Sequence, residues 1–134
     1  MRGHAMRHLY AVVTLAALAI GGCGSSSSAV RPINVACVVH NARGDASVQT
    51  LETKPPAQLG TATGYVRVRL KEGVIVTVTR WPNAAAARAA AQSFKALAVR
   101  LAASSTRIEQ RASTVIIAAP RAAAGESALL KGCE

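Results

Sequence analysis

The stretch Tyr65-Val66-Arg67-Val68-Arg69-Leu70-Lys71-Glu72-Gly73-Val74-Ile75-Val76-Thr77-Val78-Thr79-Arg80 decides the fold. Each half alternates between apolar and polar residues, which is typical of a strand with one buried face. The apolar set comprises Val66, Val68, Leu70, Val74, Val76 and Val78. Gly73 separates the halves and permits a tight reversal. The stretch therefore predicts a β-hairpin with a valine-rich face.

A helix is expected directly after this hairpin. Trp81-Pro82 ends the second strand, and Asn83 is a good N-cap. The segment from Ala84 to about Ser104 is rich in alanine, which has the highest helix propensity. Its apolar stripe contains Ala87, Ala90, Ala91, Phe94, Leu97, Ala98 and Leu101. We expect this stripe to pack, through Phe94, Leu97 and Leu101, against the valine face of the hairpin.

The rest of the C-terminal half repeats the same order. Two short strands are expected over 106–111 and 114–119, with a turn near Ala112-Ser113, and a short helix over 121–133. From residue 65 onward the order is ββαββα. This order predicts an α+β fold in which helices pack on one face of an antiparallel β-sheet.

The segment before the hairpin is ambiguous. Residues 33–40 are rich in β-branched side chains, which favours a strand. However, Ile33, Ala36, Cys37 and His40 also fit one face of a helix, so both possibilities stay open. Residues 46–52 form a possible strand, which ends at Lys54-Pro55-Pro56 because proline lacks an N–H donor.

The N-terminus has the features of an export signal. Arg2 and Arg7 precede an apolar run from Leu9 to Ile20, which is too short to span a bilayer. The run ends in Ile20-Gly21-Gly22-Cys23, which resembles the lipobox of bacterial lipoproteins. The resemblance implies that residues 1–22 are a signal peptide and that Cys23 is lipidated and becomes the first residue of the mature chain. An ordinary secreted protein with an unmodified Cys23, or a short membrane anchor, is the alternative.

The mature chain divides into a spacer and a domain. Residues 23–30 combine Cys23 with four serines, so we expect a flexible linker. Residues 31–134 have the length of one small domain. The order of its elements, with a cysteine near each end, resembles small uncharacterised exported proteins of high-GC Gram-positive bacteria. This resemblance implies no activity.

Two cysteines remain once Cys23 carries lipid. Cys37 and Cys133 bracket the domain, and an exported protein lies in an oxidising compartment. We therefore predict a Cys37–Cys133 disulfide, with two buried free thiols as the alternative. Closing a loop of roughly a hundred residues contributes about 4.7 kcal/mol on the chain-entropy model.

The mature chain is strongly basic. Removing Arg2 and Arg7 with the signal leaves 14 basic residues against six acids, a net charge of about +8. This balance favours anionic lipid or wall polymer as a neighbour, while export makes nucleic acid an unsuitable partner. Arg67, Arg69 and Lys71 are predicted to form a row on the polar side of the hairpin and to contact such a surface. Alternatively, these residues only solvate a strand that discourages edge pairing.

Residues with catalytic chemistry are scarce. His40 is the only histidine after residue 22, whereas a zinc site needs three or four ligands. Cys37-Val38-Val39-His40 has the residues of a thiolate and its base, but a disulfide would consume the thiol. Gly125-Glu126-Ser127 lacks the second glycine of a nucleophile elbow. Trp81 is expected to plug the edge of the core, with a ligand platform as the alternative. We predict no catalytic residue, metal or cofactor.

These observations favour a non-enzymatic role. The leading hypothesis is a membrane-anchored envelope lipoprotein, at the outer face of the cytoplasmic membrane, that binds or scaffolds an unknown envelope protein, anionic lipid or wall polymer. The alternatives are a small accessory subunit of an enzyme whose active site a partner completes, or an inhibitor or stability factor of an exported enzyme. An enzyme would need polar side chains that converge in a pocket.

Overall fold

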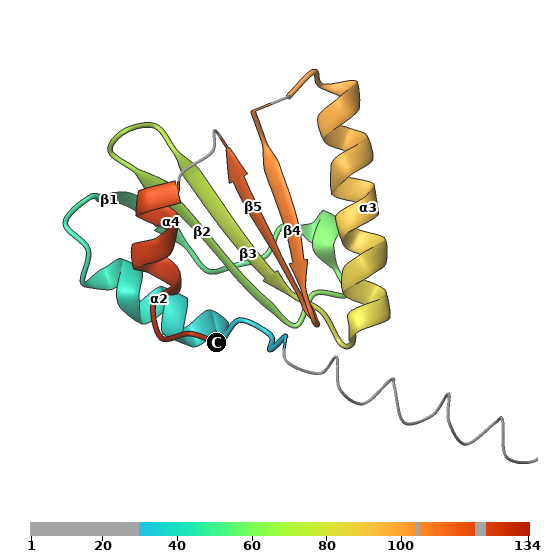
Figure 1. The fold of residues 1–134 in the computed structure, drawn as a ribbon, viewed down its shortest axis with the longest axis horizontal. Coiled ribbons are helices and arrows are strands. Elements are labelled where there is room, and N and C mark those ends of the chain that lie inside the picture. The colour runs from blue at the N-terminus through green and yellow to red at the C-terminus, as the bar shows by residue number, and fades with distance from the viewer. Residues whose placement is uncertain (1–29, 104, 120–122) are drawn as a thin grey trace, which may run out of the picture. The chain divides into compact units, whose positions relative to one another are not determined.

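A five-stranded antiparallel sheet organises the domain (Figure 1). The computed structural model describes residues 30–103, 105–119 and 123–134. The strands are β1 (Val48–Glu52), β2 (Gly64–Leu70), β3 (Ile75–Arg80), β4 (Arg107–Arg111) and β5 (Thr114–Ala119). Their order across the sheet is β1-β2-β3-β5-β4. The predicted α+β fold with an antiparallel sheet is confirmed, as are both hairpins.

The β2–β3 hairpin buries the valine-rich face that the sequence predicts. Val66 lies opposite Val78, and Val68 lies opposite Val76, and all four side chains are buried. Gly73 has a φ of 83° in the turn, a backbone conformation that is accessible to glycine at little cost. The alternation of the sequence thus specifies one buried face of this hairpin.

Within the described residues, three α-helices and one short 3₁₀ helix accompany the sheet. They are α2 (Val35–Arg43), η1 (Ala57–Leu59), α3 (Ala84–Arg100) and α4 (Ala123–Leu130). Asn83 caps α3 as predicted, because its side chain accepts a hydrogen bond from the Ala86 N–H at 2.8 Å. The helix ends at Arg100, four residues before the predicted end. Residues 120–122, where we expected α4 to begin, lie outside the described residues.

The ambiguous segment is a helix. Asn34 caps α2 by accepting a hydrogen bond from the Cys37 N–H at 3.2 Å, which satisfies a donor that a helix start leaves free. The buried positions are Val38 and Ala42, which are one helical turn apart. The predicted helical face is wrong in part, because Ala36 and His40 are exposed.

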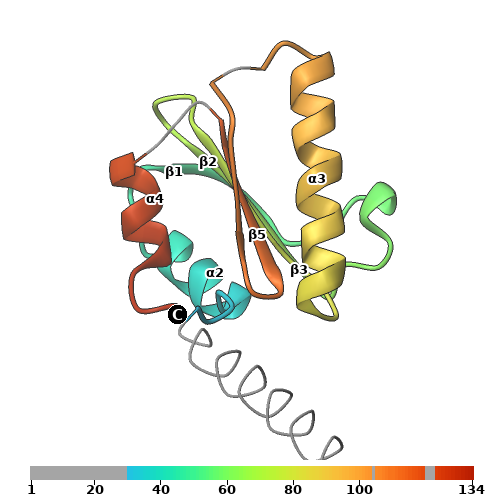
Figure 2. The same cartoon turned by 45° about the vertical axis from the view of Figure 1, so that its right-hand side comes forward.

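One face of the sheet, called the first face here, packs against α2 and α4. Its core is made of aliphatic side chains from β2, β3 and β5 together with residues of the two helices. The largest of those that are almost fully buried are Ile33, Val38, Val66, Val68, Val76, Val78, Ile116 and Leu129. Figure 2 shows α2 and α4 together on this side of the sheet.

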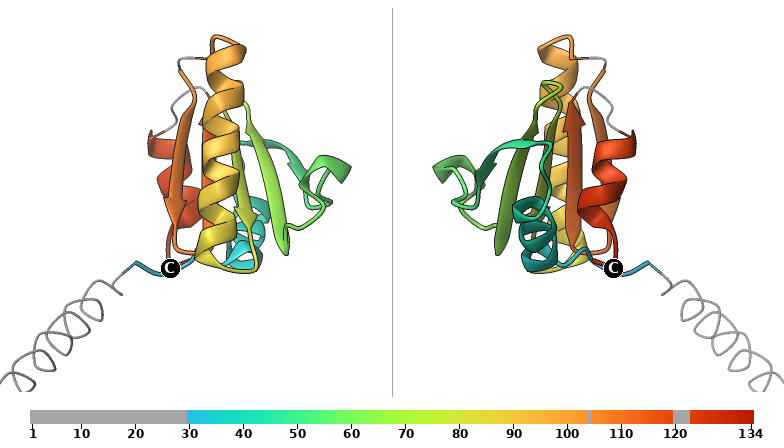
Figure 3. Two further views of the ribbon diagram at one scale, coloured as in Figure 1. Left: turned by 90° about the vertical axis from the view of Figure 1, so that its right-hand side faces the viewer. Right: turned by 90° about the vertical axis from the view of Figure 1, so that its left-hand side faces the viewer.

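The opposite side, called the second face, carries α3, so the expectation that the helices share one face is wrong (Figures 2 and 3). Ala87 and Ala91 of α3 pack with Val115 and Trp81 rather than with the hairpin valines. Leu97 is 43% exposed and Leu101 is 69% exposed. The apolar stripe of α3 therefore covers the sheet with small alanine side chains and leaves Leu97 partly and Leu101 largely exposed.

The neighbours of α3 on β5 explain this difference. Val115 packs with α3, whereas Ile116 belongs to the core of the first face. Successive side chains of a strand point to opposite faces, so the run Val115-Ile116-Ile117 supplies apolar residues to both. A continuous apolar run is typical of a strand covered on both sides.

The predicted disulfide is present and ties the two ends of the domain. Cys37 in α2 is bonded to Cys133, with 5.4 Å between their Cα atoms and a sequence separation of 96 residues. The Asn34 N–H also donates to the Cys133 carbonyl at 2.7 Å. The Ile33 N–H donates to the Thr114 hydroxyl at 3.2 Å. The chain therefore enters the domain at an end fixed by both covalent and hydrogen bonds.

Candidate functional site

The predicted basic row lies along β2, on the second face, where α3 does not cover the sheet. Arg67 and Arg69 alternate with the buried Val66 and Val68, and Lys71 follows in the turn. Arg69 and Lys71 are exposed. Arg67 lies 3.7 Å from Glu52 on the neighbouring strand β1. The row therefore has two cations without an ionic partner among the described residues and one that faces a carboxylate.

The cysteine and histidine of the Cys37-Val38-Val39-His40 segment do not form a nucleophile and its base. The Cys37 sulfur is in the disulfide, and His40 is an exposed residue of α2. His40 lines a shallow depression of about 450 Å³ with Asp45 and Lys131. The adjacent Asn41 side chain instead ties α2 to α4, because its amide donates to the carbonyls of Leu129 and Lys131 at 2.9 and 3.0 Å.

Trp81 has a structural environment, as the sequence predicted. The residue is 8% exposed, and its indole N–H donates to the Thr79 hydroxyl at 2.9 Å. That hydroxyl in turn donates to the Val115 carbonyl at 3.4 Å. Trp81 also borders a depression of about 350 Å³ with Pro82 and Ser113. Its polar atom is already satisfied, which favours a role in packing.

An ion network on β4 is a feature that the sequence reasoning missed. Arg107 pairs with Glu109 and with Glu126 of α4, and Arg111 pairs with Glu109 and Glu134. Glu126 is 5% exposed. Hydrogen bonding from Arg111 lowers the pKa of Glu109 below its ordinary value. The hydrogen bond to Glu126 raises the pKa of Arg107. The Glu109 carboxylate and the Arg107 guanidinium therefore stay charged over a wide pH range.

This network had a signal in the sequence. Arg107-Ile108-Glu109-Gln110-Arg111 places charges of alternating sign at every second position, so a strand puts all three on one face. Their cross-strand neighbours include Ile116, so the network belongs to the first face. It seals the edge of that face between β4 and α4.

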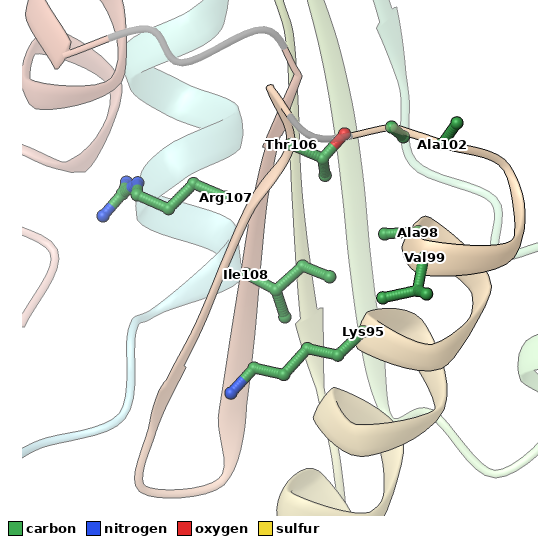
Figure 4. A pocket seen from close by; sticks show the side chains of 8 residues that line it. Lys95, Ala98, Val99, Ala102, Thr106, Arg107 and Ile108 are labelled. Carbon is green, nitrogen blue, oxygen red and sulfur yellow. The ribbon is translucent and has the colours of Figure 1, made fainter.

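A groove lined mainly by apolar side chains lies between α3 and β4. Its volume is about 490 Å³, and its walls combine apolar side chains with two cationic ones. The walls consist of Lys95, Ala98, Val99, Ala102, Ala103, Thr106, Arg107 and Ile108. Figure 4 shows Ile108 and Lys95 directed into the gap between strand and helix, while Arg107 points away to the other side of β4.

The end of α3 adds exposed apolar surface to this groove. Val99 lines the groove and is 80% exposed. Leu97 and Leu101, which are 43% and 69% exposed, are four residues apart and lie together on another side of the helix. Sequence reasoning assigned Leu97 and Leu101 to the core, because their spacing fits a buried stripe.

Two further findings bear on function. Within residues 30–103, 105–119 and 123–134, no three side chains of His, Cys, Asp or Glu gather as a metal site. None of the helices in these ranges has the length and apolar character that crossing a bilayer requires. Cys23, the predicted signal peptide over 1–22 and nearly all of the predicted linker lie outside the described residues.

No protein family, curated protein or solved structure matches the chain.

Proposed function

We propose that this protein is a lipid-anchored envelope protein at the outer face of the cytoplasmic membrane, and that its domain is a non-enzymatic binding or scaffolding module. The observation that carries the proposal is Ile20-Gly21-Gly22-Cys23, placed after a short apolar segment and before a serine-rich spacer. Two or more acyl chains hold a protein firmly at a bilayer, because each buried methylene contributes about 0.8 kcal/mol.

The way in which the domain begins supports a tether at this end. Ile33 and Asn34 are hydrogen-bonded to Thr114 and Cys133, and Cys133 is bonded to Cys37. A pull on the linker is therefore transmitted to a covalent bridge and to the sheet, rather than to a terminus that frays. An anchored domain needs this resistance more than a free one.

A module that binds needs a surface rather than a catalytic pocket. The basic row of Arg67, Arg69 and Lys71 offers one surface, which suits the phosphate groups shared by anionic lipids and wall polymers. The row runs from the middle of β2 toward the turn at Lys71. The chain enters the domain at the opposite end of the sheet, near Thr114, since Gly64 pairs with Arg80 and Arg80 with Thr114.

The anchor is tested by mass spectrometry of the mature N-terminus isolated from membranes. We expect an acylated Cys23 as the first residue, and release of a Cys23→Ser chain from the membrane. A secreted product that is cut elsewhere and carries a free thiol at Cys23 would contradict the anchor, as would full membrane retention of the Cys23→Ser chain.

The basic row is tested with the Cys23→Ser chain, which removes the acyl group. Cosedimentation with anionic vesicles and binding of long-chain polyphosphate, each over a salt series, distinguish lipid from polymer. We expect salt-dependent binding that Arg67→Glu with Arg69→Glu removes, because the attraction decays within a Debye length of about 8–10 Å. The control reverses Arg43 and Arg88, which are exposed outside the row. If both double variants lose the same amount of binding, the attraction depends on net charge and not on the basic row.

The alternative, an accessory subunit or inhibitor of an exported enzyme, also has a specific observation in its favour. The groove between α3 and β4 is apolar, open and at the edge of the sheet, which suits a protein better than a polyanion.

A further inference from the structure

The outer edge of β4 is available for pairing. β4 is the last strand in the sheet order. A two-residue turn, Ala112-Ser113, joins it to β5, and Arg111 lies opposite Thr114. Hydrogen-bonded pairs of an antiparallel ladder fall at alternate residues, so Arg107, Glu109 and Arg111 bond to β5. The N–H and C=O groups of Ile108 and Gln110 therefore point outward, where the described residues supply no neighbouring strand.

The same edge opens onto the groove described above. Ile108 is one wall, and the other is formed by Ala98 and Val99 of α3 and by Ala102 just after the helix. Figure 4 shows the strand and the helix side by side, with Ile108 directed toward the helix. A strand added to β4 would alternate its side chains between the two faces. One set would enter the apolar groove, and the other would lie beside the charged residues of the ion network.

The charge of α3 restricts what can occupy this groove. Arg88, Lys95 and Arg100 are exposed, and no acidic residue occurs between Ala84 and Arg100. Lys95 reaches into the groove (Figure 4) and has no ionic partner among the described residues. A carboxylate on the occupant would supply the missing charge.

A second copy of this chain is a poor occupant. If two β4 strands paired antiparallel about Ile108, each Lys95 beside Ile108 would face the other copy's Lys95. Pairing about Glu109 instead places Glu109 opposite its own copy and Arg107 opposite Arg111. Like charges that lie directly opposite on neighbouring strands are destabilising.

A membrane is also a poor occupant, because lipid headgroups offer phosphate groups but no chain of peptide N–H and C=O groups to pair with the edge of β4.

We propose that the groove between α3 and β4 binds an extended, acidic segment of a partner protein, which adds to the edge of β4 as a sixth strand. Main-chain hydrogen bonds to Ile108 and Gln110 hold the segment. An apolar side chain lies against Ile108 and Val99, and a carboxylate meets Lys95. This inference rests on the proposed role as a binding module and names the kind of partner, but it does not depend on the acyl group.

The test uses the full chain in detergent and a short capped peptide with threonine at every second position. Valine and glutamate take turns at the positions between, so that both side chains face the groove. A second peptide with lysine in place of glutamate is the charge control. We expect the glutamate peptide to bind, and Lys95→Glu to weaken it about tenfold while improving binding of the lysine peptide. Arg100→Glu is the matched control, because it makes the same charge change on the same helix outside the groove and should have little effect.

Two further measurements identify the mode of binding. Val99→Ser should weaken binding of the glutamate peptide. Leu101→Ser should not, because Leu101 is exposed but does not line the groove. Hydrogen exchange should slow at the Ile108 and Gln110 amides when the glutamate peptide is added. Binding without that protection would overturn strand addition, and equal effects of Lys95→Glu and Arg100→Glu would overturn the role of Lys95.

Three other results would also overturn the proposal. They are the absence of binding by the glutamate peptide, dimerisation through β4, and cosedimentation with anionic vesicles that Lys95→Glu abolishes. All of these readouts are independent of acylation. A negative result for peptide binding would therefore not contradict the proposed anchor, and an unmodified Cys23 would not contradict binding of the peptide in the groove.

Discussion

The two faces of the sheet differ in what covers them. The first face is packed with branched aliphatic side chains, cross-linked by Cys37–Cys133 and sealed at its edge by the ion network. The second face is covered over part of its area by alanines of α3 and leaves Val99 and Leu101 largely exposed. The comparison shows a domain that concentrates its stability on one side and leaves the other available for binding.

Side-chain size accounts for much of this difference. Burial of apolar surface contributes about 25 cal/mol per Å², and an alanine of α3 has far less surface to bury than a leucine of α4. The alanine side chains allow α3 to lie near β4 and β5 without filling the space beside β4. The groove therefore results from the small side chains on this part of α3.

Removing the disulfide should have the largest effect on stability. Replacing both cysteines, Cys37→Ala with Cys133→Ala, should lower the free energy of unfolding by about 4–5 kcal/mol, because the bridge closes a long loop. The loss is measured by urea denaturation. Cys23→Ser is the control, since Cys23 lies outside the domain, and should leave the midpoint unchanged. A similar midpoint for all three chains would mean that the first face does not depend on its cross-link.

A pair of leucines tests the contrast in packing directly. Leu129 is fully buried in the first face, whereas Leu101 at the end of α3 is 69% exposed. Leu129→Ala should cost about 2–5 kcal/mol, as large-to-small changes in cores do, and Leu101→Ala should cost less than about 0.5 kcal/mol. Thermal or urea denaturation of the two variants decides the matter. Equal costs would show that α3 is packed as tightly as α4.

Much of the fold was predictable because its signals are local. The alternation of residues 65–80, the Asn83 cap and the alanine-rich helix each specify an element from neighbouring residues. The face on which α3 lies depends on β5, where Val115 and Ile116 serve opposite sides. The prediction that all helices share one face rests on the apolar face of the hairpin valines alone. The continuous apolar run in β5 was the signal that indicated two covered faces.

The candidate sites were harder to predict because they depend on which elements become neighbours. The disulfide followed from cysteine count and compartment, and it is confirmed. The pairing of Arg107 with Glu126 joins residues on different elements, which no local pattern specifies. The groove exists because α3 lies beside an edge strand, so Lys95 and Ile108 meet only in the folded chain. The acylation of Cys23 and the basic row stay predictions.

Two ion pairs on opposite faces sharpen the contrast further. Glu126 is nearly buried beside Arg107 on the first face, whereas Glu52 and Arg67 on the second face are both about half exposed. Arg107→Met should cost about 1–3 kcal/mol, because it leaves a buried carboxylate without its partner. Arg67→Met should cost less than about 1 kcal/mol. Adding Glu126→Met to Arg107→Met should recover part of the loss, and a failure to recover would point to lost packing instead.

The smallest expected effect is the response of the first face to acid. Arg111 holds the pKa of Glu109 below its ordinary value, so folding favours the ionised carboxylate. The stability from this pair is therefore fully present above the ordinary glutamate range, near pH 4–5, and is lost as the pH falls through the lower pKa of the folded state.

Because Glu109 is about a third exposed, solvent screening limits this contribution to less than about 1 kcal/mol. Denaturation midpoints measured between pH 3 and pH 7 should fall more steeply for the native chain than for Glu109→Gln. Glu52→Gln on the second face is the control and should retain the full acid-dependent loss. If the two variants respond alike, the ion network does not stabilise the edge of the first face, and its charges serve only to keep β4 soluble.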